Sequence, residues 1–290
     1  MSLPPPTIPR CYRHPDREGG RSCTRCGKSA CSDCLVQATV GSQCLDCAKA
    51  SRPDVNTRVK LATSRVLTPV TYGLIAANVG LFVLMGLADP AAWRGRITPL
   101  HGQLGLSKSI LEFGAINVDG TPMDPHGWYR LVTSGFIHFG FVHIAMNMLL
   151  LYQLGMMLER SIGSMRTAAV YFASLLAGSF GVTMLAQEGL TGGASGAVFG
   201  LMACAAIGMH RRGINIFTTG IGTTLVLNIV LTFTISGISI GGHVGGAIGG
   251  AICGWFLFAP GWRPTPKWLG WAVCAAVAVV SVAGAVLLTI

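Results

Sequence analysis

A serine and a histidine that could work together in nucleophilic catalysis each stand in a short glycine-rich stretch. Ser195 lies in the stretch 192–200 (GGASGAVFG), and His243 lies in the stretch 241–246 (GGHVGG). A serine hydroxyl is a weak nucleophile until a base removes its proton. Histidine is the side chain best suited to act as that base near neutral pH. The pair therefore predicts a serine nucleophile activated by a histidine base.

Two other polar side chains are suited to stabilising the negative charge that such an attack creates. His143 and Asn147 stand one helical turn apart, and both carry N–H donors for a developing oxyanion. The backbone N–H of Ser195 would be a further donor if this serine begins a helix. One such donor typically lowers the barrier by about 3 kcal/mol. Because no carboxylate lies at the same depth to orient His243, we expect a dyad rather than a triad.

The elements that must position these residues are apolar segments long enough to cross a bilayer. Hydrophobic residues make up 51% of the chain and charged residues only 11%, against about 25% charged residues in ordinary globular proteins. Seven apolar segments each come close to the ~20 residues that a membrane-spanning helix requires. They cover residues 68–88, 143–160, 167–186, 195–210, 216–236, 241–259 and 268–289. The pattern predicts an all-α polytopic membrane protein with seven transmembrane helices in residues 67–290.

The four candidate residues begin alternate spans. His143 and Asn147 lie at the start of the second span, Ser195 starts the fourth and His243 starts the sixth. Since successive spans reverse direction, these three starts meet at one face of the membrane. Any one of these residues alone is more often a packing or hydrogen-bonding residue than a catalytic one. Polar side chains in a membrane are costly, however, so their joint placement at one depth favours a functional site.

Lysine and arginine predict which face this is. Of the 21 lysines and arginines, all but Arg94, Arg96, Lys108 and Arg130 lie before the first span or in loops on the same side as the N-terminus. Cytoplasmic segments carry such an excess. We therefore expect a cell-membrane protein with a cytoplasmic N-terminus, an external C-terminus and the candidate residues near the outer face.

The long external loop, residues 89–142, is partly apolar and is expected to lie in the membrane interface. His126 and His138 are interpreted as loop histidines. A last set of three cysteines is interpreted as small core residues: Cys204, Cys253 and Cys274.

Glycines predict that the helices carrying the candidate pair approach closely. Gly242, Gly246 and Gly250 recur every four residues along the sixth span, and such a stripe lets a neighbouring helix come near. A hydrogen bond of ~2.6–3.2 Å between serine and histidine requires that approach. Phe199 stands one turn after Ser195, where it could pack under the His243 ring, although a core aromatic is the ordinary interpretation.

The first 50 residues carry a second kind of chemistry. Seven of the ten cysteines and one histidine form four pairs with two-residue spacing: Cys11 and His14, Cys23 and Cys26, Cys31 and Cys34, Cys44 and Cys47. Eight ligands make two tetrahedral zinc sites. A disulfide framework is the alternative, and a cytoplasmic location disfavours it. We predict a zinc-binding module at 1–50, stabilised by its metal, and a basic linker at 51–66.

This cysteine pattern resembles a B-box-type zinc finger. The resemblance implies that Cys11 and His14 share one ion with Cys31 and Cys34, while Cys23 and Cys26 share the other with Cys44 and Cys47. We see no open catalytic position among these ligands. A structural role or the binding of a cytoplasmic protein partner is the expected use of the module.

Residues 68–260 resemble the rhomboid family of intramembrane serine proteases. The matching motifs are Trp128-Tyr129-Arg130, His143-x-x-x-Asn147, Glu159-Arg160, Gly193-Ala194-Ser195-Gly196 and His243-Val244-Gly245-Gly246. The resemblance implies a six-helix bundle plus a seventh C-terminal helix. It implies Ser195 as nucleophile, His243 as general base and an oxyanion hole that includes His143 and Asn147. Phe199 stands where the family commonly has a tyrosine beneath the base.

The resemblance also implies the substrates. These would be transmembrane segments of other membrane proteins, cleaved near the outer face through an acyl-enzyme without any cofactor for catalysis. The bilayer and such substrates are the expected partners, and nucleic acid is not. One alternative is a catalytically inactive rhomboid-like protein that binds or escorts membrane helices. A proton-coupled transporter would predict internal repeats, which the sequence does not display.

Overall fold

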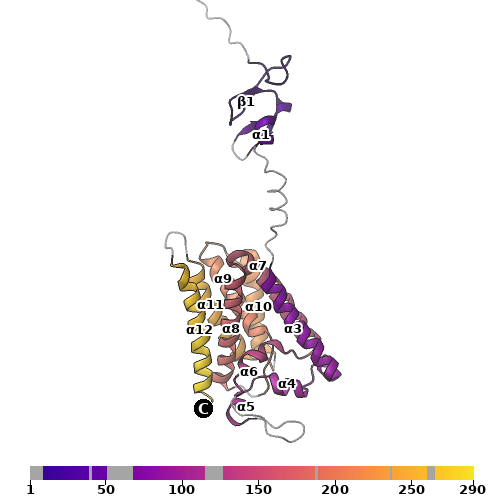
Figure 1. Cartoon of the computed structure of the whole chain (residues 1–290), viewed down its shortest axis with the longest axis vertical. Helices are drawn as coiled ribbons and strands as arrows, with labels where there is room; N and C mark the ends of the chain where they lie inside the picture. The colour runs from indigo at the N-terminus through magenta and orange to yellow at the C-terminus, as the bar shows by residue number, and fades with distance from the viewer. Residues whose placement is uncertain are drawn as a thin grey trace, which may run out of the picture. The chain divides into compact units, whose positions relative to one another are not determined.

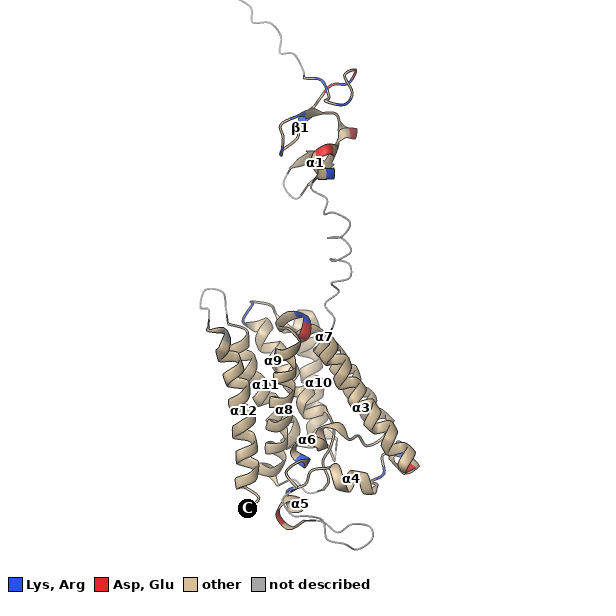
Figure 2. Ribbon diagram, viewed as in Figure 1, with Lys and Arg blue, Asp and Glu red and all other residues tan. Residues whose placement is uncertain are grey.

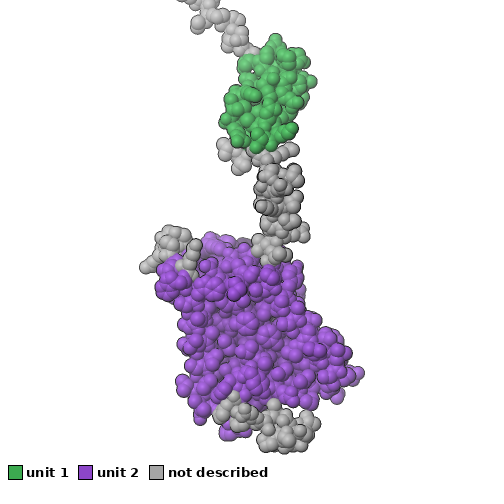
Figure 3. All heavy atoms as spheres, viewed as in Figure 1, with its two compact units in different colours: residues 1–67 green, residues 68–290 purple. Residues whose placement is uncertain are grey.

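The computed structural model describes residues 9–38, 41–50, 68–114, 127–186, 189–235, 237–259 and 265–290 (Figure 1). The chain divides into two compact units, Met1–Leu67 and Thr68–Ile290, which Figure 3 distinguishes by colour. The predicted linker at 51–66 and the loop histidine His126 lie outside the described residues.

The first unit is built from very short elements. Strand β1 (Arg21–Ser22) pairs with β2 (Ser29–Ala30), and after the turn η1 (Ser32–Cys34) strand β3 (Leu35–Gln37) pairs with β4 (Ser42–Cys44), which helix α1 (Leu45–Ala50) follows. Its hydrophobic cluster has only four buried members, and three of them are Cys11, Cys31 and Cys34. So small a core cannot supply the stability of a domain by itself.

The second unit is a bundle of apolar helices, as predicted. Among the residues that the structure describes, five helices are long and apolar enough to cross a membrane: α3 (Pro69–Ala88), α7 (Phe141–Ile162), α8 (Ser164–Leu185), α11 (Ile240–Leu257) and α12 (Lys267–Leu287). Two shorter apolar helices, α9 (Ser195–His210) and α10 (Ile221–Thr234), complete the described bundle. Charged residues in Figure 2 lie toward the helix ends and in the loops, while the middle of the bundle is free of them in the described residues. The second unit is therefore the all-α, polytopic membrane part of the chain.

One predicted span has the wrong bounds. The segment 216–236 was expected to form a single helix, but it divides into the turn η4 (Ile216–Thr219) and helix α10. Gly220 joins them in the left-handed conformation, with φ of 80°. A residue at positive φ interrupts a right-handed helix, and α10 therefore has 14 residues.

The long loop between α3 and α7 is folded into short helices. In the described residues these are η2 (Pro90–Arg94), α4 (Pro99–Leu104), α5 (Lys108–Phe113), α6 (Arg130–Thr133) and η3 (Ser134–Phe136). Arg130 is fully buried, and its guanidinium donates to the carbonyl oxygens of Gly102 at 2.5 Å and Gly105 at 2.8 Å. Thr133 donates its hydroxyl hydrogen to the Leu104 carbonyl at 2.8 Å. These bonds attach the loop to the segment just before α7.

Glycines bring α8, α9 and α11 into backbone contact, which confirms the predicted close approach. A Cβ atom at Gly246 would collide with the carbonyl group of Gly196, and one at Gly250 would collide with that of Gly200. On the opposite side, a Cβ at Gly245 would collide with the carbonyl oxygen of Ala177. Because α11 has no side chains at these points, it lies directly against α9 and α8.

Candidate active site

Helix α7 supplies His143 and Asn147 in its first two turns. Gly140 precedes the helix at φ of 85° and turns the chain into it. The Nδ1 atom of His143 accepts a hydrogen bond from the Phe139 backbone N–H at 3.3 Å. A neutral imidazole that accepts at Nδ1 carries its proton on Nε2. His143 is therefore fixed as a hydrogen-bond donor at Nε2.

The Nε2 atom of His143 lies close to the candidate nucleophile. A Cβ atom built on Gly193 would be 2.8 Å from His143 Nε2 and 3.8 Å from Ser195 Oγ. Gly193 has φ of 128°, which only glycine adopts readily. This glycine leaves open the space between the two side chains, where a developing oxyanion could sit. The Asn147 amide, which also donates to the His143 carbonyl at 2.9 Å, lines the same space.

Ser195 is the first residue of α9. The segment just before it forms backbone hydrogen bonds with two parts of the loop between α3 and α7. The Gly193 N–H donates to the Ser134 carbonyl at 2.8 Å. Thr191 and Leu106 exchange two backbone hydrogen bonds, of 2.7 and 2.9 Å. The loop between α3 and α7 thus fixes the approach to the serine. At the start of a helix, the backbone N–H of Ser195 has no partner in the preceding turn.

His243 lies in the first turn of α11, after the N-cap residue Ser239, whose hydroxyl accepts from the Gly242 N–H at 3.1 Å. Its ring stacks on Phe199 with a centroid distance of 4.1 Å and an interplanar angle of 19°. It is 9% exposed. Phe199 therefore lies directly against the face of the candidate base.

All five candidate residues of the membrane unit line one cavity of about 680 Å³: His143, Asn147, Ser195, Phe199 and His243. They come from α7, α9 and α11, three helices that are distant in sequence. Within the described part of the bundle, no hydrogen bond joins Ser195 Oγ to His243. Catalytic hydrogen bonds are often long before substrate binds.

Sequence reasoning missed the part that His138 plays. It is fully buried, and its Nε2 accepts from the backbone N–H of Ala194, next to Ser195, at 3.5 Å. Its ring centroid is 5.1 Å from that of His143. Burial lowers the pKa of His138 to about 3, with His143 as a second cause. His138 is thus a packed neutral residue of the site, and its place five residues before His143 in an apolar stretch was the available signal.

His101 and Thr232 were missed as well. His101 Nδ1 accepts from the Thr98 N–H at 3.2 Å, so its Nε2–H donates to the His138 carbonyl at 3.1 Å. Burial lowers the pKa of His101. Thr232, from α10, lies with its hydroxyl oxygen 2.8 Å from His243 Nδ1. Neither residue stands in a pattern that distinguishes it in the sequence.

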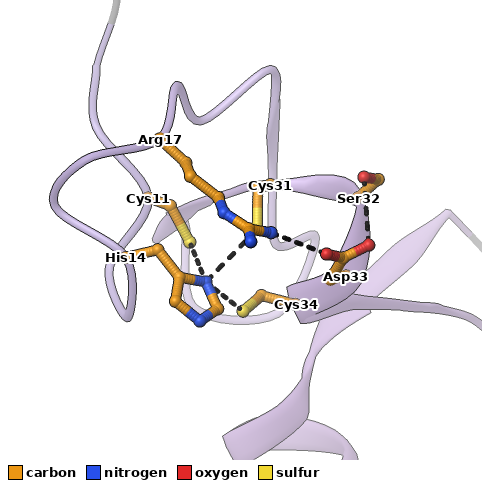
Figure 4. Close-up of polar contacts among 7 residues, drawn as sticks. All are labelled: Cys11, His14, Arg17, Cys31, Ser32, Asp33 and Cys34. Atoms are coloured by element: carbon orange, nitrogen blue, oxygen red, sulfur yellow. Dashed lines mark hydrogen bonds and ion pairs between the residues drawn. The ribbon is translucent and has the colours of Figure 1, made fainter.

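The eight metal-ligand candidates of the first unit form two clusters. One holds Cys11, His14, Cys31 and Cys34, and the other holds Cys23, Cys26, Cys44 and Cys47, with the ligand atoms of each cluster within 4.8 Å of one another. This grouping is the one that the B-box resemblance implies. Figure 4 shows the first cluster, in which His14 Nδ1 is 3.3 Å from Cys34 Sγ and 3.5 Å from Cys31 Sγ. All ten cysteines are free thiols. Four sulfur and nitrogen donors around one point suit a tetrahedral metal ion.

Comparison with known proteins bears on the membrane unit. Residues 125–260 match the family model of the Rhomboid domain. RHOMBOID-like protein 4 of Arabidopsis thaliana is 36% identical over 107 residues, which is 37% of this chain and 26% of that protein. Rhomboid protease GluP of Bacillus subtilis is 27% identical over 171 residues, 58% of this chain and 31% of that protein.

A third relative, Rhomboid-type serine protease 2 of Emericella nidulans, is 39% identical over 80 residues, 27% of this chain and 16% of that protein. This chain thus spans less than a third of the length of each of these relatives. The matched region contains α7, α8, α9, α10 and α11, the helices that surround the cavity. Residues 125–260 of the membrane unit therefore correspond to a rhomboid domain.

Proposed function

We propose that the membrane unit is an intramembrane serine endopeptidase that uses Ser195 as nucleophile and His243 as base. The observation that carries this proposal is that both side chains, with the Nε2–H of His143 beside them, line one cavity in a rhomboid domain. A nucleophile, a base and a preset oxyanion donor around one space are the parts that acyl transfer requires.

The reaction follows from the donors and acceptors. His243 Nε2 removes the proton from Ser195 Oγ as the oxygen attacks the scissile carbonyl carbon. The oxyanion accepts hydrogen bonds from His143 Nε2–H, the Asn147 amide and the Ser195 backbone N–H. The protonated His243 then gives its proton to the leaving amine, which departs and leaves an acyl group on Ser195. His243 then takes a proton from a water molecule as the water oxygen attacks the acyl carbon. The bond between that carbon and Ser195 Oγ breaks, Oγ takes the proton back from His243, and the released carboxylic acid ionises.

The surroundings of the site favour a transmembrane segment as substrate. The cavity lies between apolar helices and is lined by aliphatic side chains that include Leu150, Leu175 and Val198. Within a helix the peptide groups are hydrogen-bonded and enclosed by side chains, so a substrate must unwind locally before Ser195 can attack. Small residues, which lower the cost of unwinding, are expected at the cleaved site. The distribution of lysine and arginine supports a location of this site near the outer face.

Serine reactivity tests the proposal directly. The purified full-length chain in liposomes is incubated with a fluorophosphonate probe or with a transmembrane substrate that has small residues near its outer end. We expect labelling and cleavage by the unaltered chain and by Ser161→Ala, whose exposed serine lies at the far end of α7. We expect neither from Ser195→Ala. Cleavage that persists in Ser195→Ala at the unaltered rate would refute the assignment.

A second candidate function is a catalytically inactive rhomboid-like protein that binds membrane helices. It is favoured by the fact that no hydrogen bond joins Ser195 to His243 in the described bundle. Such a protein would leave the fluorophosphonate probe unreacted, yet a transmembrane peptide with a photoreactive group would still cross-link to residues of the cavity.

For the first unit we propose that each ligand cluster holds one zinc ion. Both clusters offer four close donors, and the small hydrophobic core leaves metal binding as the main source of stability. The metal content of the purified chain tests this proposal, with two zinc ions per chain expected. Cys23→Ser should lower the content to one, and Cys204→Ser, in the membrane unit, should leave it at two.

The cytoplasmic location of this unit and the external C-terminus are part of the same proposal. They rest on the excess of lysine and arginine on one side of the spans. A membrane-impermeant thiol reagent applied to intact cells should react with a cysteine added after Ile290 and leave one added before Pro9 unmodified.

A further inference from the structure

Thr232 is the residue of α10 that reaches the candidate base. Its hydroxyl oxygen lies 2.8 Å from His243 Nδ1 and 2.7 Å from the backbone carbonyl oxygen of Asn228. The residue is 3% exposed. The two distances mean that one hydroxyl group serves two hydrogen bonds at once.

The number of protons decides the direction of these bonds. A threonine hydroxyl has one hydrogen to donate and two lone pairs that can accept. The Asn228 carbonyl oxygen can only accept, so the hydroxyl hydrogen goes to that oxygen. The Thr232 oxygen then has only lone pairs to offer to His243. The bond of 2.8 Å therefore requires a hydrogen on His243 Nδ1, which leaves Nε2 unprotonated.

We propose that Thr232 is a positioning residue that holds His243 in the tautomer with a free Nε2. This is the tautomer that can take a proton from Ser195, so the catalytic consequence rests on the proposed function. A carboxylate performs the same task in a catalytic triad, where it accepts from Nδ1–H of the base. Here a neutral hydroxyl, itself held by a backbone carbonyl, takes that place.

Two contacts together fix the ring. Phe199 lies against one face of His243 with a centroid distance of 4.1 Å, which restricts the tilt of the imidazole. Thr232 binds one edge of it, which sets the rotation of the ring and distinguishes its two nitrogen atoms. Stacking alone would allow the ring to flip and exchange Nδ1 with Nε2. The hydrogen bond removes that freedom.

The burial of Thr232 sets it apart from other threonines of the same helix. Thr224 and Thr234 also donate to the carbonyl four residues earlier, at 3.0 and 2.8 Å, which is a common habit of threonine in helices. Thr234 is exposed, however, and Gly222 and Thr232 are the buried residues of α10. A threonine can bond to the carbonyl of its own helix while it is exposed, as Thr234 does. Only a threonine that also contacts the imidazole, as Thr232 does, can orient the ring.

The tautomer itself can be measured without any activity. The full-length chain with nitrogen-15-labelled histidine, in the Ser195→Ala background, is examined by NMR in detergent micelles, and His243→Gln identifies the resonances of this ring. We expect a protonated Nδ1 and an unprotonated Nε2. Thr232→Val should shift the ring toward the Nε2–H tautomer, Thr232→Ser should keep the original one, and Thr234→Val is the matched control. The proposal would be overturned if Nε2 of His243 is protonated in the chain that keeps Thr232. It would also be overturned if Thr232→Val leaves the tautomer of His243 unchanged.

The rate of fluorophosphonate labelling adds a functional measure. We expect Thr232→Val to slow labelling of Ser195 by about 10–100-fold, the size of effect seen when a metal-bound histidine loses the partner that orients its ring. Thr232→Ser should restore most of the rate, and Thr234→Val should not change it. An unaltered rate in Thr232→Val overturns the catalytic part of the proposal. If the unaltered chain is not labelled at all, the proposed function fails, and the tautomer measurement still decides the role of Thr232.

Discussion

The two histidines of the cavity are set for opposite tasks by their Nδ1 atoms. His143 accepts at Nδ1 from the Phe139 N–H and so presents a donor at Nε2. Under the assignment argued above, His243 donates from Nδ1 to Thr232 and so presents an acceptor at Nε2. One ring is ready to stabilise an oxyanion and the other to take a proton. The difference arises from one backbone group and one hydroxyl, with no charged residue involved.

The donor role of His143 predicts a selective loss of rate. Replacing His143 by Ala removes one oxyanion donor and should lower the rate of cleavage by about 10²–10³-fold. The KM for a transmembrane substrate should change little, because the donor acts mainly on the transition state. Cleavage kinetics in liposomes measure both quantities. Met146→Ala, which also changes a residue lining the cavity, is the control and should retain most of the rate. A loss confined to KM would contradict the donor role.

Burial of His138 predicts that the membrane unit loses stability in acid. Its pKa is about 3 in the folded chain and about 6.5 in an unfolded one. Between these values the unfolded state binds more protons, so the free energy of unfolding falls as the pH drops below 6.5. The slope is about 1.4 kcal/mol per pH unit for this group, and above pH 6.5 the group contributes no pH dependence.

Thermal unfolding in detergent between pH 4 and pH 8 measures this effect. We expect the Tm of the unaltered chain to fall more steeply below pH 6 than the Tm of His138→Asn. His210→Asn, which alters an exposed histidine at the end of α9, should follow the unaltered chain. Equal slopes for all three would show that His138 does not titrate as its burial requires.

At this scale the sequence allowed the prediction of residues that stand out from their surroundings. Ser195, His243, His143 and Asn147 are polar groups at the starts of apolar segments, and such groups are rare enough to be noticed. Thr232 could not be found in this way, because a threonine in a membrane helix usually satisfies its hydroxyl with its own backbone. His138 and His101 depend on how the loop before α7 folds, and that loop has no periodic pattern.

At the scale of the elements, the site depends on how closely α11 lies against α9. Gly246 is in contact with the carbonyl group of Gly196, the residue after Ser195. Substituting Gly246 by Ala should move α11 away and separate His243 from Ser195. We expect a lower Tm and loss of fluorophosphonate labelling. The matched control is Gly80→Ala on α3, where a Cβ would have no neighbour within 4 Å. This variant should keep the Tm and the labelling of the unaltered chain. Unchanged labelling in Gly246→Ala would contradict the requirement for close approach.

A single carboxylate links the end of α7 to the beginning of α3. Glu159 is fully buried and accepts from the Val70 N–H at 3.0 Å, the Thr71 N–H at 2.8 Å and the Thr71 hydroxyl at 2.6 Å. It thereby satisfies backbone donors that the start of α3 leaves open. Removing one partner of such a bond typically costs about 1.5–3 kcal/mol.

Glu159→Ala is therefore expected to lower the Tm of the membrane unit by several degrees. The labelling rate below the Tm should be less affected, because the carboxylate is at the opposite end of α7 from His143. Arg160→Ala changes the exposed neighbour and should leave the Tm nearly unchanged. Equal Tm values for the two variants would mean that the contact with α3 is not a main source of stability.

Hydrophobic length predicted the spans well where a segment was continuous. The helices observed for 68–88 and 143–160 agree with the predicted segments to within two residues at each end. The segment 216–236 failed because hydropathy does not register the positive φ of Gly220. The short helices of the loop before α7 were not predicted in detail, since Arg130 fixes them through contacts with distant carbonyl groups.

On the scale of the whole molecule, the two units obtain their stability from different sources. The membrane unit has a large buried cluster with members on α3, α7, α8, α9, α11 and α12. The first unit has four buried residues in its cluster, of which three are ligand candidates. Its sequence spacing was enough to predict four ligand pairs, because each pair lies in a tight turn, while the division of these pairs between two ions came from the B-box resemblance. No motif of similar regularity in the sequence indicates which protein partner this unit would bind.

This difference predicts that metal removal affects one unit alone. Treating the full-length chain with a zinc chelator should unfold residues 9–50, because under the proposal above the two zinc ions are the main source of their stability. Every residue that lines the cavity belongs to the membrane unit, so labelling of Ser195 should continue at the same rate. Limited proteolysis, followed by mass spectrometry, should show new cuts only before residue 68, and adding zinc back should suppress them. Resistance of the first unit to proteolysis in the chelator would contradict a structural role for the metal, and a fall in labelling would show that the two units are coupled.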